Sequence, residues 1–325
     1  MQTKAETTAT APGKIILFGE HAVVYGRPAI AAPLSRLRAK AVVSAWDGRG
    51  VQLLAPDLGL AQRLDQADPD DAIALPVRLV QQQAGLTRLP DMTITVTSDI
   101  PIASGLGSGA AISAAIIRAL AQYLGLEGRL SPAWVSDLTF EVEKIHHGTP
   151  SGIDNTVVAY ERPVYFRREQ PLNLIETFVV GRALNLLVGD TGVRSSTKVA
   201  VGDVRRQWLL ETARFEKLFD GCGLLCEAAR AAIEAGDLEL VGRLMNDNHA
   251  LLVAMTVSSP ELEMLVSAAR QAGALGAKLS GGGRGGNMIA LVDDATAGTV
   301  HDALLAAGAG RVLHSSIEAT SSSHI

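Results

Sequence analysis

The strongest constraint on the fold is a strand, a glycine-rich turn and an apolar helix that follow closely on one another. The segment MTITVTS (92–98) alternates apolar and polar residues, as expected of a strand with one buried face. The turn SGLGSG (104–109) leads into an alanine- and isoleucine-rich run (108–123) that predicts a helix. Helix N-termini present unpaired backbone N–H groups, and glycines let an anion approach them closely. The pattern predicts a phosphate-binding turn, with a tight, purely structural turn as the alternative.

This turn matches neither of two common nucleotide-binding signatures. No Gly-Lys-Ser/Thr follows it, which excludes a Walker A loop. A dinucleotide fingerprint would need a third glycine where the chain has Ala110. Taken by itself, the turn therefore leaves the phosphate-bearing ligand open.

Composition narrows the class of protein. Of the 325 residues 47% are hydrophobic and 19% charged, so the chain can bury the core of one large domain or of two. The formal net charge is −5 and no basic block occurs, so we expect no nucleic-acid partner. The start has no apolar signal-peptide core, and no uncharged apolar run approaches the roughly 18 residues of a membrane span. We therefore expect no membrane partner.

The only two cysteines, Cys222 and Cys226, lie four residues apart in a helix-like stretch. They are too few for a metal-binding set, and we interpret them as small core thiols. Such low cysteine use is typical of the reducing cytoplasm, which is the location that we expect.

The secondary-structure signals change along the chain. The first part is rich in strands with helices between them. Further on, helices are predicted over 198–232, 236–255 and 260–272, followed by strands around a glycine loop. The sequence therefore predicts an α+β protein with a boundary near residue 182. The N-terminal domain (1–182) would carry the phosphate-binding turn, and the C-terminal domain would span 183–325.

Three further stretches point to a functional site. In APGKIILFGEHAVVYG (11–26), Gly-Glu-His interrupts a strand pattern that begins near Lys14. In EKIHHGTPSGIDN (143–155), Glu143 lies near a helix C-terminus, where its charge opposes the helix dipole, and a turn then presents Asp154. Each of these could be an ordinary surface feature when taken alone. The glycine loop in KLSGGGRGGN (278–287) lies between apolar strands, which favours a functional loop over a flexible linker.

Together these stretches resemble the three motifs of the GHMP small-molecule kinases, in the family's order and over nearly the whole chain. The resemblance implies an α+β fold of two domains. The N-terminal domain would resemble domain 2 of ribosomal protein S5, the C-terminal domain would have a ferredoxin-like sheet, and ATP would bind in the cleft between them. Members of the family are often dimeric, so a homodimer is left open.

Within the family, GEHAVVYG and HGTPSGIDN look most like the members that phosphorylate mevalonate. The implied reaction is ATP-dependent phosphorylation of the primary (C5) hydroxyl of mevalonate to 5-phosphomevalonate, a step of isoprenoid biosynthesis. Alternatives are GHMP kinases for phosphomevalonate, homoserine or a sugar, a related ATP-dependent decarboxylase, and a non-catalytic ligand sensor. A phosphorylated substrate would need an extra basic cluster, which we do not find. Lys14 argues against the decarboxylase, and its combination with Glu143 and Asp154 argues against the sensor.

The resemblance also implies catalytic roles. Asp154 would accept the proton of the substrate hydroxyl or orient that hydroxyl, and Lys14 would pair with Asp154 and stabilise charge on the transferring group. Ser108 and Glu143 would bind Mg²⁺, for which a hydroxyl and a carboxylate are suitable ligands. A bound cation would also offset the unfavourable position of Glu143 near its helix end.

Binding roles follow in the same way. Glu20, His21 and Thr197 would lie on the substrate side. The residues implied in holding the ATP phosphates are Ser104, Gly105, Leu106, Gly107, Ser108, Gly109 and Ala110, backed by Gly282, Gly283 and Arg284.

The sequence departs from the family pattern at three positions. Gly109 stands where relatives usually have a second serine, which puts the Mg²⁺ role of Ser108 in doubt. Arg194 lies one position earlier than the corresponding arginine of many relatives, so its role is doubtful. Arg284 stands where a small residue is commoner. Because none of these changes removes Lys14, Glu143 or Asp154, we still expect an active kinase.

Overall fold

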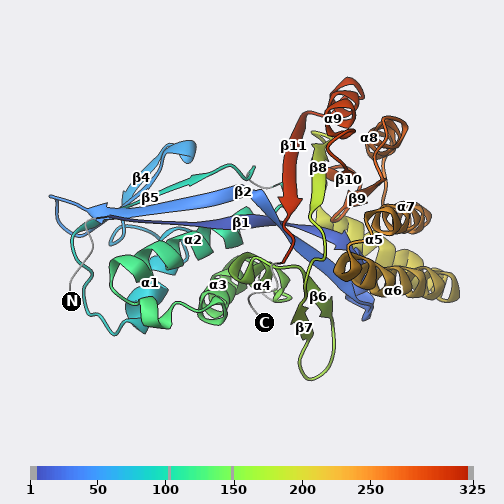
Figure 1. The fold of residues 1–325 in the computed structure, drawn as a ribbon. Coiled ribbons are helices and arrows are strands. Elements are labelled where there is room, and N and C mark those ends of the chain that lie inside the picture. Colours follow the sequence, from blue (N-terminus) through green and yellow to red (C-terminus); the bar gives the residue numbers. More distant parts are fainter. Residues whose placement is uncertain (1–5, 102–103, 148–149, 321–325) are drawn as a thin grey trace. The chain divides into compact units, whose positions relative to one another are not determined.

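The computed structural model describes residues 6–101, 104–147 and 150–320, which form two compact units. The first unit contains the described parts of Met1–Lys14 and Leu37–Glu161, and the second contains those of Ile15–Arg36 and Arg162–Ile325. Strands β1 (Glu6–Phe18) and β2 (Ala29–Ala45) each pass from one unit to the other (Figure 1). An early segment of the chain therefore belongs to the second unit. The single boundary expected near residue 182 stays a prediction.

In the first unit, β5 (Met92–Ser98) is the strand predicted from alternation, and its residues alternate between buried and half-buried. It pairs in antiparallel fashion with the Ala39–Ala45 part of β2 and in parallel with β3 (Val51–Ala55). Strand β4 (Leu60–Arg63) pairs with β3 on the other side, after the short helix η2 (Pro56–Leu58). The alternation leaves one face of the sheet apolar, and the helices of the unit cover that face (Figure 1).

Helix α2 (Ser108–Tyr123) lies at the centre of these helices and contacts α1 (Ala74–Gln83), α3 (Pro132–His147) and α4 (Ile153–Tyr160). The short helix η3 (Glu127–Arg129) links α2 to α3. Because α2 has neighbours on several sides, it is buried along nearly its whole length, mostly through alanine and isoleucine. The apolar run of the sequence therefore serves helix packing as well as the turn in front of it.

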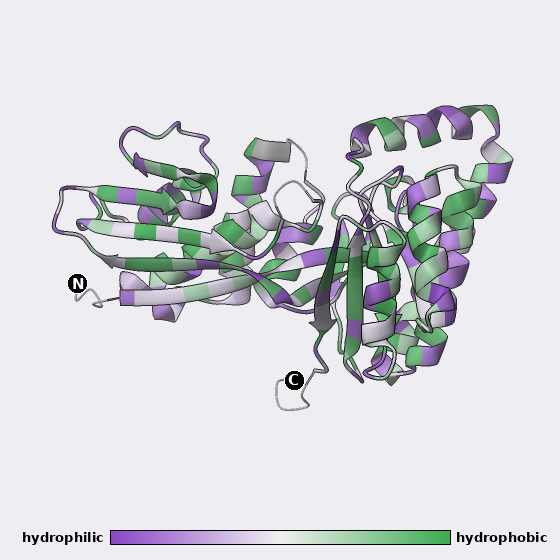
Figure 2. Cartoon of the chain, turned by 90° about the horizontal axis from the view of Figure 1, so that it is seen from above, coloured by the Kyte–Doolittle hydropathy of each residue, from purple (hydrophilic) through white to green (hydrophobic). Residues whose placement is uncertain are grey.

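The second unit contains a four-stranded antiparallel sheet in the order β11 (Arg311–Ile317), β8 (Leu184–Asp190), β10 (Asn287–Val292) and β9 (Gly276–Ser280). Ala29–Ala31 of β2 pairs with β6 (Val164–Arg167), which in turn pairs with β7 (Leu174–Thr177). The helices show apolar and polar residues on different faces, as expected of helices with one buried side (Figure 2). The helices of this unit are η1 (Ala22–Tyr25), α5 (Thr197–Leu210), α6 (Thr212–Ala235), α7 (Leu238–Ala254), α8 (Pro260–Gln271) and α9 (Ala297–Ala306).

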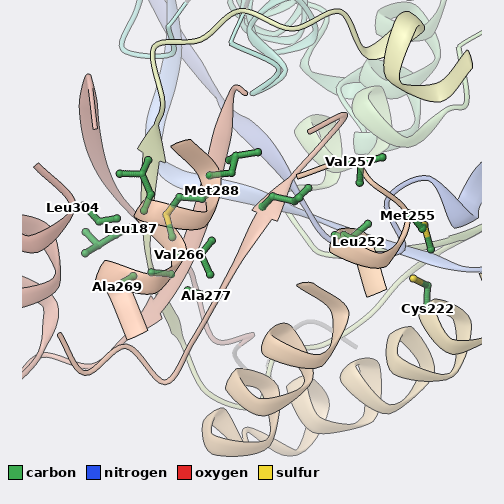
Figure 3. Packing of buried hydrophobic residues seen from close by; sticks show 14 of the residues in the cluster. Leu187, Cys222, Leu252, Met255, Val257, Val266, Ala269, Ala277, Met288 and Leu304 are labelled. Carbon is green, nitrogen blue, oxygen red and sulfur yellow. The ribbon is translucent and has the colours of Figure 1, made fainter. Parts of the chain in front are cut away.

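The core of the second unit lies between this sheet and its helices. Figure 3 shows Leu187, Ala277 and Met288 of the sheet among Val266 of α8 and Leu304 of α9. Every residue of β10 is buried, which is expected of a central strand. Cys222 and Cys226 are buried, unpaired thiols in α6, so the interpretation of core cysteines is confirmed.

The run expected as one helix over 198–232 is two helices, so that prediction was wrong. Glu211 leaves the helical region (φ −127°, ψ 48°) between α5 and α6. The Thr212 hydroxyl donates to the carbonyl of Trp208 (2.9 Å), whose indole donates to Glu216 (2.8 Å). No glycine or proline marks the break, which is held by these side-chain bonds. None of the helices in the described ranges is long and apolar enough to cross a membrane.

Candidate active site

The predicted phosphate-binding turn opens α2 in the first unit. Gly105 (φ +77°) and Gly107 (φ +73°) both have left-handed backbone conformations, which favour glycine. Gly107 is the N-cap of α2 and supplies no side-chain cap. The Leu106 carbonyl accepts a hydrogen bond from the backbone N–H of Lys14 (2.8 Å), which joins the turn to β1. The first turn of α2 thus offers backbone N–H groups without a capping side chain, as an anion-binding turn requires.

Lys14 lies against this turn. A Cβ atom at Gly107 would come within 2.7 Å of the Lys14 Cγ, so a glycine is needed for the lysine stem to pass. The Lys14 ammonium then reaches the Asp154 carboxylate, with Nζ and Oδ2 3.1 Å apart. The two side chains are 12% and 32% exposed, so the pair is open to a ligand. The structure therefore brings Lys14, Asp154 and the glycine turn together.

Asp154 is the second residue of α4, whose N-cap is Gly152 (φ +90°). The N-terminal N–H groups of α4 and the Lys14 ammonium both present positive charge to its carboxylate. A carboxylate in this setting is placed to interact with a polar hydrogen of a substrate while its own charge is balanced. The sequence signal for Asp154 was the Pro-Ser-Gly-x-Asp turn. Gly148, which precedes this turn in the sequence, lies outside the described residues.

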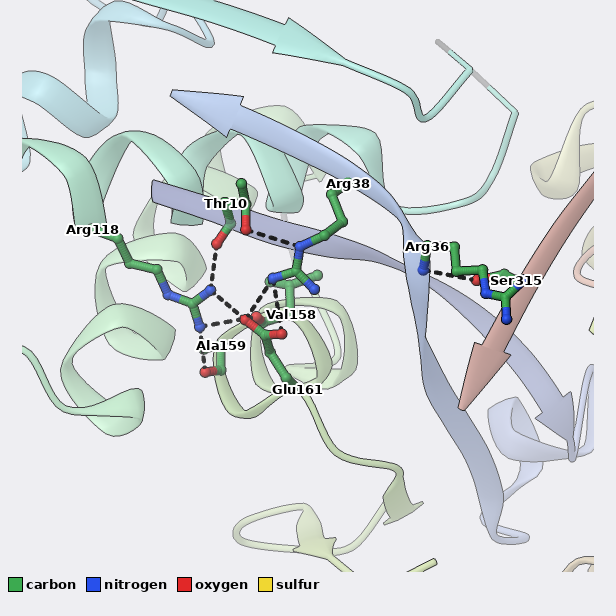
Figure 4. A network of polar contacts seen from close by, with 8 residues as sticks. All are labelled: Thr10, Arg36, Arg38, Arg118, Val158, Ala159, Glu161 and Ser315. Carbon is green, nitrogen blue, oxygen red and sulfur yellow. Dashed lines mark hydrogen bonds and ion pairs between the residues drawn. The ribbon is translucent and has the colours of Figure 1, made fainter. Parts of the chain in front are cut away.

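The C-terminus of α4 is tied to the rest of the first unit by a polar network (Figure 4). Glu161, the left-handed C-cap (φ 52°), accepts hydrogen bonds from Arg38 (2.9 and 3.0 Å) and from Arg118 of α2 (2.6 Å). Arg118 also donates to the carbonyl of Ala159 (2.8 Å), and to that of Thr10 in β1 (2.7 Å). A cation at a helix C-terminus is favourable, and here it fixes α4 against α2 and β1. Motif reasoning missed this support, because its members lie far apart in the sequence.

Glu143 is buried near the end of α3. A Cβ atom at Gly109 would lie 3.8 Å from the Glu143 Oε1, so the carboxylate faces the first turn of α2, where Ser108 lies. These are two hard oxygen donors on neighbouring helices. Within the described residues no group of three or more His, Cys, Asp or Glu could hold a metal. Mg²⁺ commonly takes one or two protein ligands and completes its shell with phosphate oxygens and water, so Ser108 and Glu143 fit such a site.

In the second unit, the predicted substrate residue Glu20 points into the interior. Its carboxylate forms an ion pair with Lys278 of β9, and the side chains are 1% and 0% exposed. Lys278 also donates to the carbonyl of Leu279 (2.7 Å). Burial raises the pKa of Glu20 and lowers that of Lys278, and the charge of each partner acts in the opposite direction. Lys278 is the first residue of the stretch KLSGGGRGGN (278–287), but the sequence indicated no role for it.

His21 and Thr197 meet at the glycine loop. The His21 Nε2 lies 3.0 Å from the carbonyl of Gly282, so this nitrogen carries the proton that is donated. A Cβ atom at Gly282 would come within 2.8 Å of the Thr197 hydroxyl, so only glycine fits. Burial lowers the pKa of His21, and the nearby Arg284 charge adds to this effect. Two predicted substrate residues are thus brought to one point of the loop.

Arg284 has a left-handed backbone (φ 59°), and its N–H donates to the carbonyl of Val257 (2.7 Å). Its guanidinium forms an ion pair with Asp203 of α5, which also pairs with Arg206. The loop is thereby connected to the helix that begins at Thr197. Asp203 was not anticipated, because nothing in its local sequence marks it.

Comparisons with known proteins agree with these observations. The model of the GHMP kinases N terminal domain matches residues 73–162, and that of the GHMP kinases C terminal matches 229–310. A mevalonate kinase of Thermococcus sibiricus is 38% identical over 308 residues, which cover 88% of this chain and 89% of that protein. A mevalonate kinase of Pyrococcus horikoshii is 36% identical over 305 residues, with coverage of 87% and 88%.

Solved structures give the same result. The L. major mevalonate kinase, in complex with R-mevalonate, superposes with a TM-score of 0.85 at 29% identity and covers 99% of this chain and 100% of that one. The Methanococcus jannaschii mevalonate kinase has a TM-score of 0.82 at 23% identity, covers 97% and 98% of the two chains, and supports the fold alone. The predicted two-domain α+β kinase fold and the predicted family are confirmed: the chain belongs to the GHMP kinases, a family of enzymes that take ATP as the phosphoryl donor.

Proposed function

We propose that this protein is a mevalonate kinase, which transfers the γ-phosphoryl group of ATP to the C5 hydroxyl of mevalonate. The observation that carries the proposal is the open Lys14–Asp154 pair, which lies directly beside the glycine turn at the start of α2. The relatives that share 36–38% of their residues with this chain are named mevalonate kinases, and a structural neighbour at 29% identity binds R-mevalonate.

The phosphate-binding part of the mechanism belongs to the turn over Ser104–Ala110. Its left-handed glycines expose backbone N–H groups at the positive end of α2, where the ATP phosphates would bind. The Lys14 stem crosses the turn at Gly107, so its ammonium is held near both the turn and Asp154. There it would stabilise the negative charge that spreads over the transferring phosphoryl group.

Asp154 would act on the substrate hydroxyl. As the C5 oxygen forms its bond to the γ-phosphorus, the bond from that phosphorus to the bridging oxygen of ADP breaks. The hydroxyl proton passes to the Asp154 carboxylate, whose negative charge is stabilised by Lys14 and by the N-terminus of α4. General-base help of this kind contributes about 10²–10⁴ in rate.

We propose that Ser108 and Glu143 hold Mg²⁺, which when bound neutralises part of the phosphate charge. Glu143 supplies a carboxylate and Ser108 a hydroxyl, and the nucleotide and water would supply the other oxygens. Gly109 supplies no second hydroxyl, but it also places no side chain between Ser108 and Glu143.

Substrate contacts are proposed for His21 and Thr197, which converge on Gly282 in the second unit. Gly282 and Gly283 would support the ATP phosphates through their backbone, and Arg284 could reach a phosphate only by leaving Asp203. The buried, unpaired cysteines suit the reducing cytoplasm that we propose as the location.

The test is a coupled ADP-release assay with Mg-ATP and a panel of alcohols: mevalonate, phosphomevalonate, homoserine and galactose. Phosphorus NMR of the product identifies the ester. Turnover with mevalonate alone, giving a primary phosphate ester, is the expected result. Turnover with another alcohol instead would leave the family intact and overturn the proposed substrate.

A further inference from the structure

The buried pair of Glu20 and Lys278 has no part in the proposed chemistry. Both side chains are almost completely buried, at 1% and 0% exposure. The free-energy cost of removing two charges from water often exceeds their mutual attraction. Proteins in which such a pair is replaced by apolar residues are often as stable as the original. Stability therefore does not explain why a carboxylate and an ammonium group lie in this interior.

The backbone around Glu20 is held in an unusual conformation. Gly19 has φ +88°, and a Cβ atom there would come within 2.3 Å of the Pro28 carbonyl. His21 has φ +59° although it carries a side chain. Left-handed backbone at a residue with a Cβ costs free energy and persists only where surrounding contacts enforce it. Glu20 lies between these two residues and supplies such a contact through its side chain.

The contacts of this segment all lead to the same short part of the chain. Glu20 pairs with Lys278, and the Ser280 hydroxyl donates to the carbonyl of Ile16 (2.8 Å). His21 bonds to the carbonyl of Gly282. The strand-to-loop segment 278–282 is therefore joined to residues 16–21 at successive positions.

We propose that Glu20 and Lys278 are positioning residues, which hold His21 against the glycine loop next to Thr197 and do not touch the substrate themselves. The inference rests on the proposed function, because it is there that His21 and Thr197 receive their substrate role. It replaces the expectation that Glu20 contacts substrate with an indirect role, since its carboxylate is sealed from solvent.

The experiment compares the full-length wild type with the double variant Glu20→Leu/Lys278→Met, which replaces the pair by apolar side chains. We expect the double variant to fold with a Tm within a few degrees of wild type. We expect its KM for mevalonate to rise about tenfold or more, while its KM for ATP stays within about twofold. The reason is that a displaced His21 would lose its contact with mevalonate and not with ATP. Unchanged values of both KM in a folded double variant would overturn the proposal.

A matched control is Arg230→Met, which removes a partly exposed ion pair with Glu176 and Glu234 in the same unit. It should leave both KM values unchanged. If the double variant does not fold, Glu20→Asp serves instead, because it keeps the charge and shortens the side chain by one methylene. Glu20→Asp should raise the KM for mevalonate with the fold retained, and wild-type kinetics would count against positioning.

A second readout needs no substrate. In the ligand-free protein, the imidazole signals of His21 should show a titration below the ordinary range in wild type and closer to it in the double variant, since His21 would leave its buried site. Identical His21 titrations would overturn the proposal. His21→Ala should impair mevalonate turnover strongly in the wild-type background and less in the double-variant background. The effects of mutating a positioning residue and the residue that it positions are not additive. Absence of mevalonate turnover in wild type would overturn the proposed function and leave the imidazole test standing.

Discussion

Each unit contains an ion pair between a lysine and a carboxylate, and the two pairs differ in their exposure to solvent. Lys14 and Asp154 are 12% and 32% exposed and lie at the end of a helix, beside a glycine turn. Glu20 and Lys278 are sealed at 1% and 0% exposure inside a strand-and-loop junction. An open pair can exchange a partner for a substrate atom. A sealed pair can act on a substrate only through the backbone that it holds.

The largest effect should come from the open pair. Asp154→Asn removes the proton acceptor but keeps the shape of the side chain, so kcat should fall by about 10²–10⁴. Because the pair is partly exposed, the free energy of unfolding should change by only about 0–1 kcal/mol. Steady-state kinetics, ATP binding by calorimetry and thermal unfolding measure the three quantities. Retained turnover would show that Asp154 is not the catalytic base or orienter.

In the sealed pair, a substitution should affect the free energy of unfolding much more than Asp154→Asn does. The corresponding variant is Glu20→Gln. It leaves the Lys278 ammonium buried without a counter-charge, which typically costs about 3–5 kcal/mol of stability. If Asp154→Asn destabilised the fold as strongly as Glu20→Gln, the contrast between open and sealed pairs would fail.

A second test of the sealed region uses pH. His249 is buried beside β9, where its Nδ1 accepts a hydrogen bond from the N–H of Leu279 (3.2 Å). Burial lowers its pKa from 6.5 to about 4, the Glu263 charge opposes this shift, and the Arg270 and Lys278 charges add to it. The unfolded state binds the proton near pH 6.5 and the folded state only near pH 4, so stability is present above pH 6.5 and is lost as the pH falls toward 4.

The expected loss from this histidine is about 3 kcal/mol, at 1.36 kcal/mol for each unit of difference in pKa. Urea unfolding at pH 7 and pH 4.5 measures most of this loss, about 2 kcal/mol, against His249→Gln, which can still accept the Leu279 bond but does not titrate. A wild-type pH dependence equal to that of His249→Gln would mean that the region beside Lys278 is not sealed.

The glycine turn allows a third comparison, between two neighbouring glycines. Gly107→Ala places a side chain on left-handed backbone, at about 1–2 kcal/mol, and against the Lys14 stem. It should lower both stability and kcat/KM for ATP. Gly109→Ala meets only the Glu143 oxygen at 3.8 Å and lies in the first turn of α2, so it should not lower stability, because alanine favours helix over glycine by up to about 1 kcal/mol. Thermal unfolding and ATP kinetics of both variants decide the matter, and equal effects would show that Gly107 is not needed for the approach of Lys14.

The sequence was sufficient to predict the strand, the glycine turn and the apolar helix, because each depends on residues that are adjacent in the chain. It also pointed to Lys14 and Asp154 through motifs, and the structure brings these two together. The Glu20–Lys278 pair could not be predicted in this way, because 258 positions separate its members and the local sequence of Glu20 gives no sign of burial. The break at Glu211 was missed for a different reason: no glycine or proline marks it, and the side-chain bonds beside it, from Thr212 to Trp208 and from Trp208 to Glu216, have no recognised sequence signature.

The smallest expected effect concerns Arg284, which is 31% exposed and pairs with Asp203 at 16%, so this ion pair is about as exposed as that of Lys14 and Asp154. If Arg284 acts through α5, then Arg284→Gln and Asp203→Asn break one connection and should each raise the KM for mevalonate a few-fold, without adding in the double variant. If Arg284 acts on ATP, only Arg284→Gln should raise the KM for ATP, and Asp203→Asn should lower it by freeing the guanidinium. Arg206→Gln is the matched control, because Arg206 pairs with Asp203 but lies outside the loop. We expect the first pattern, because the guanidinium already has a carboxylate partner, from which it would have to separate before a phosphate could take its place.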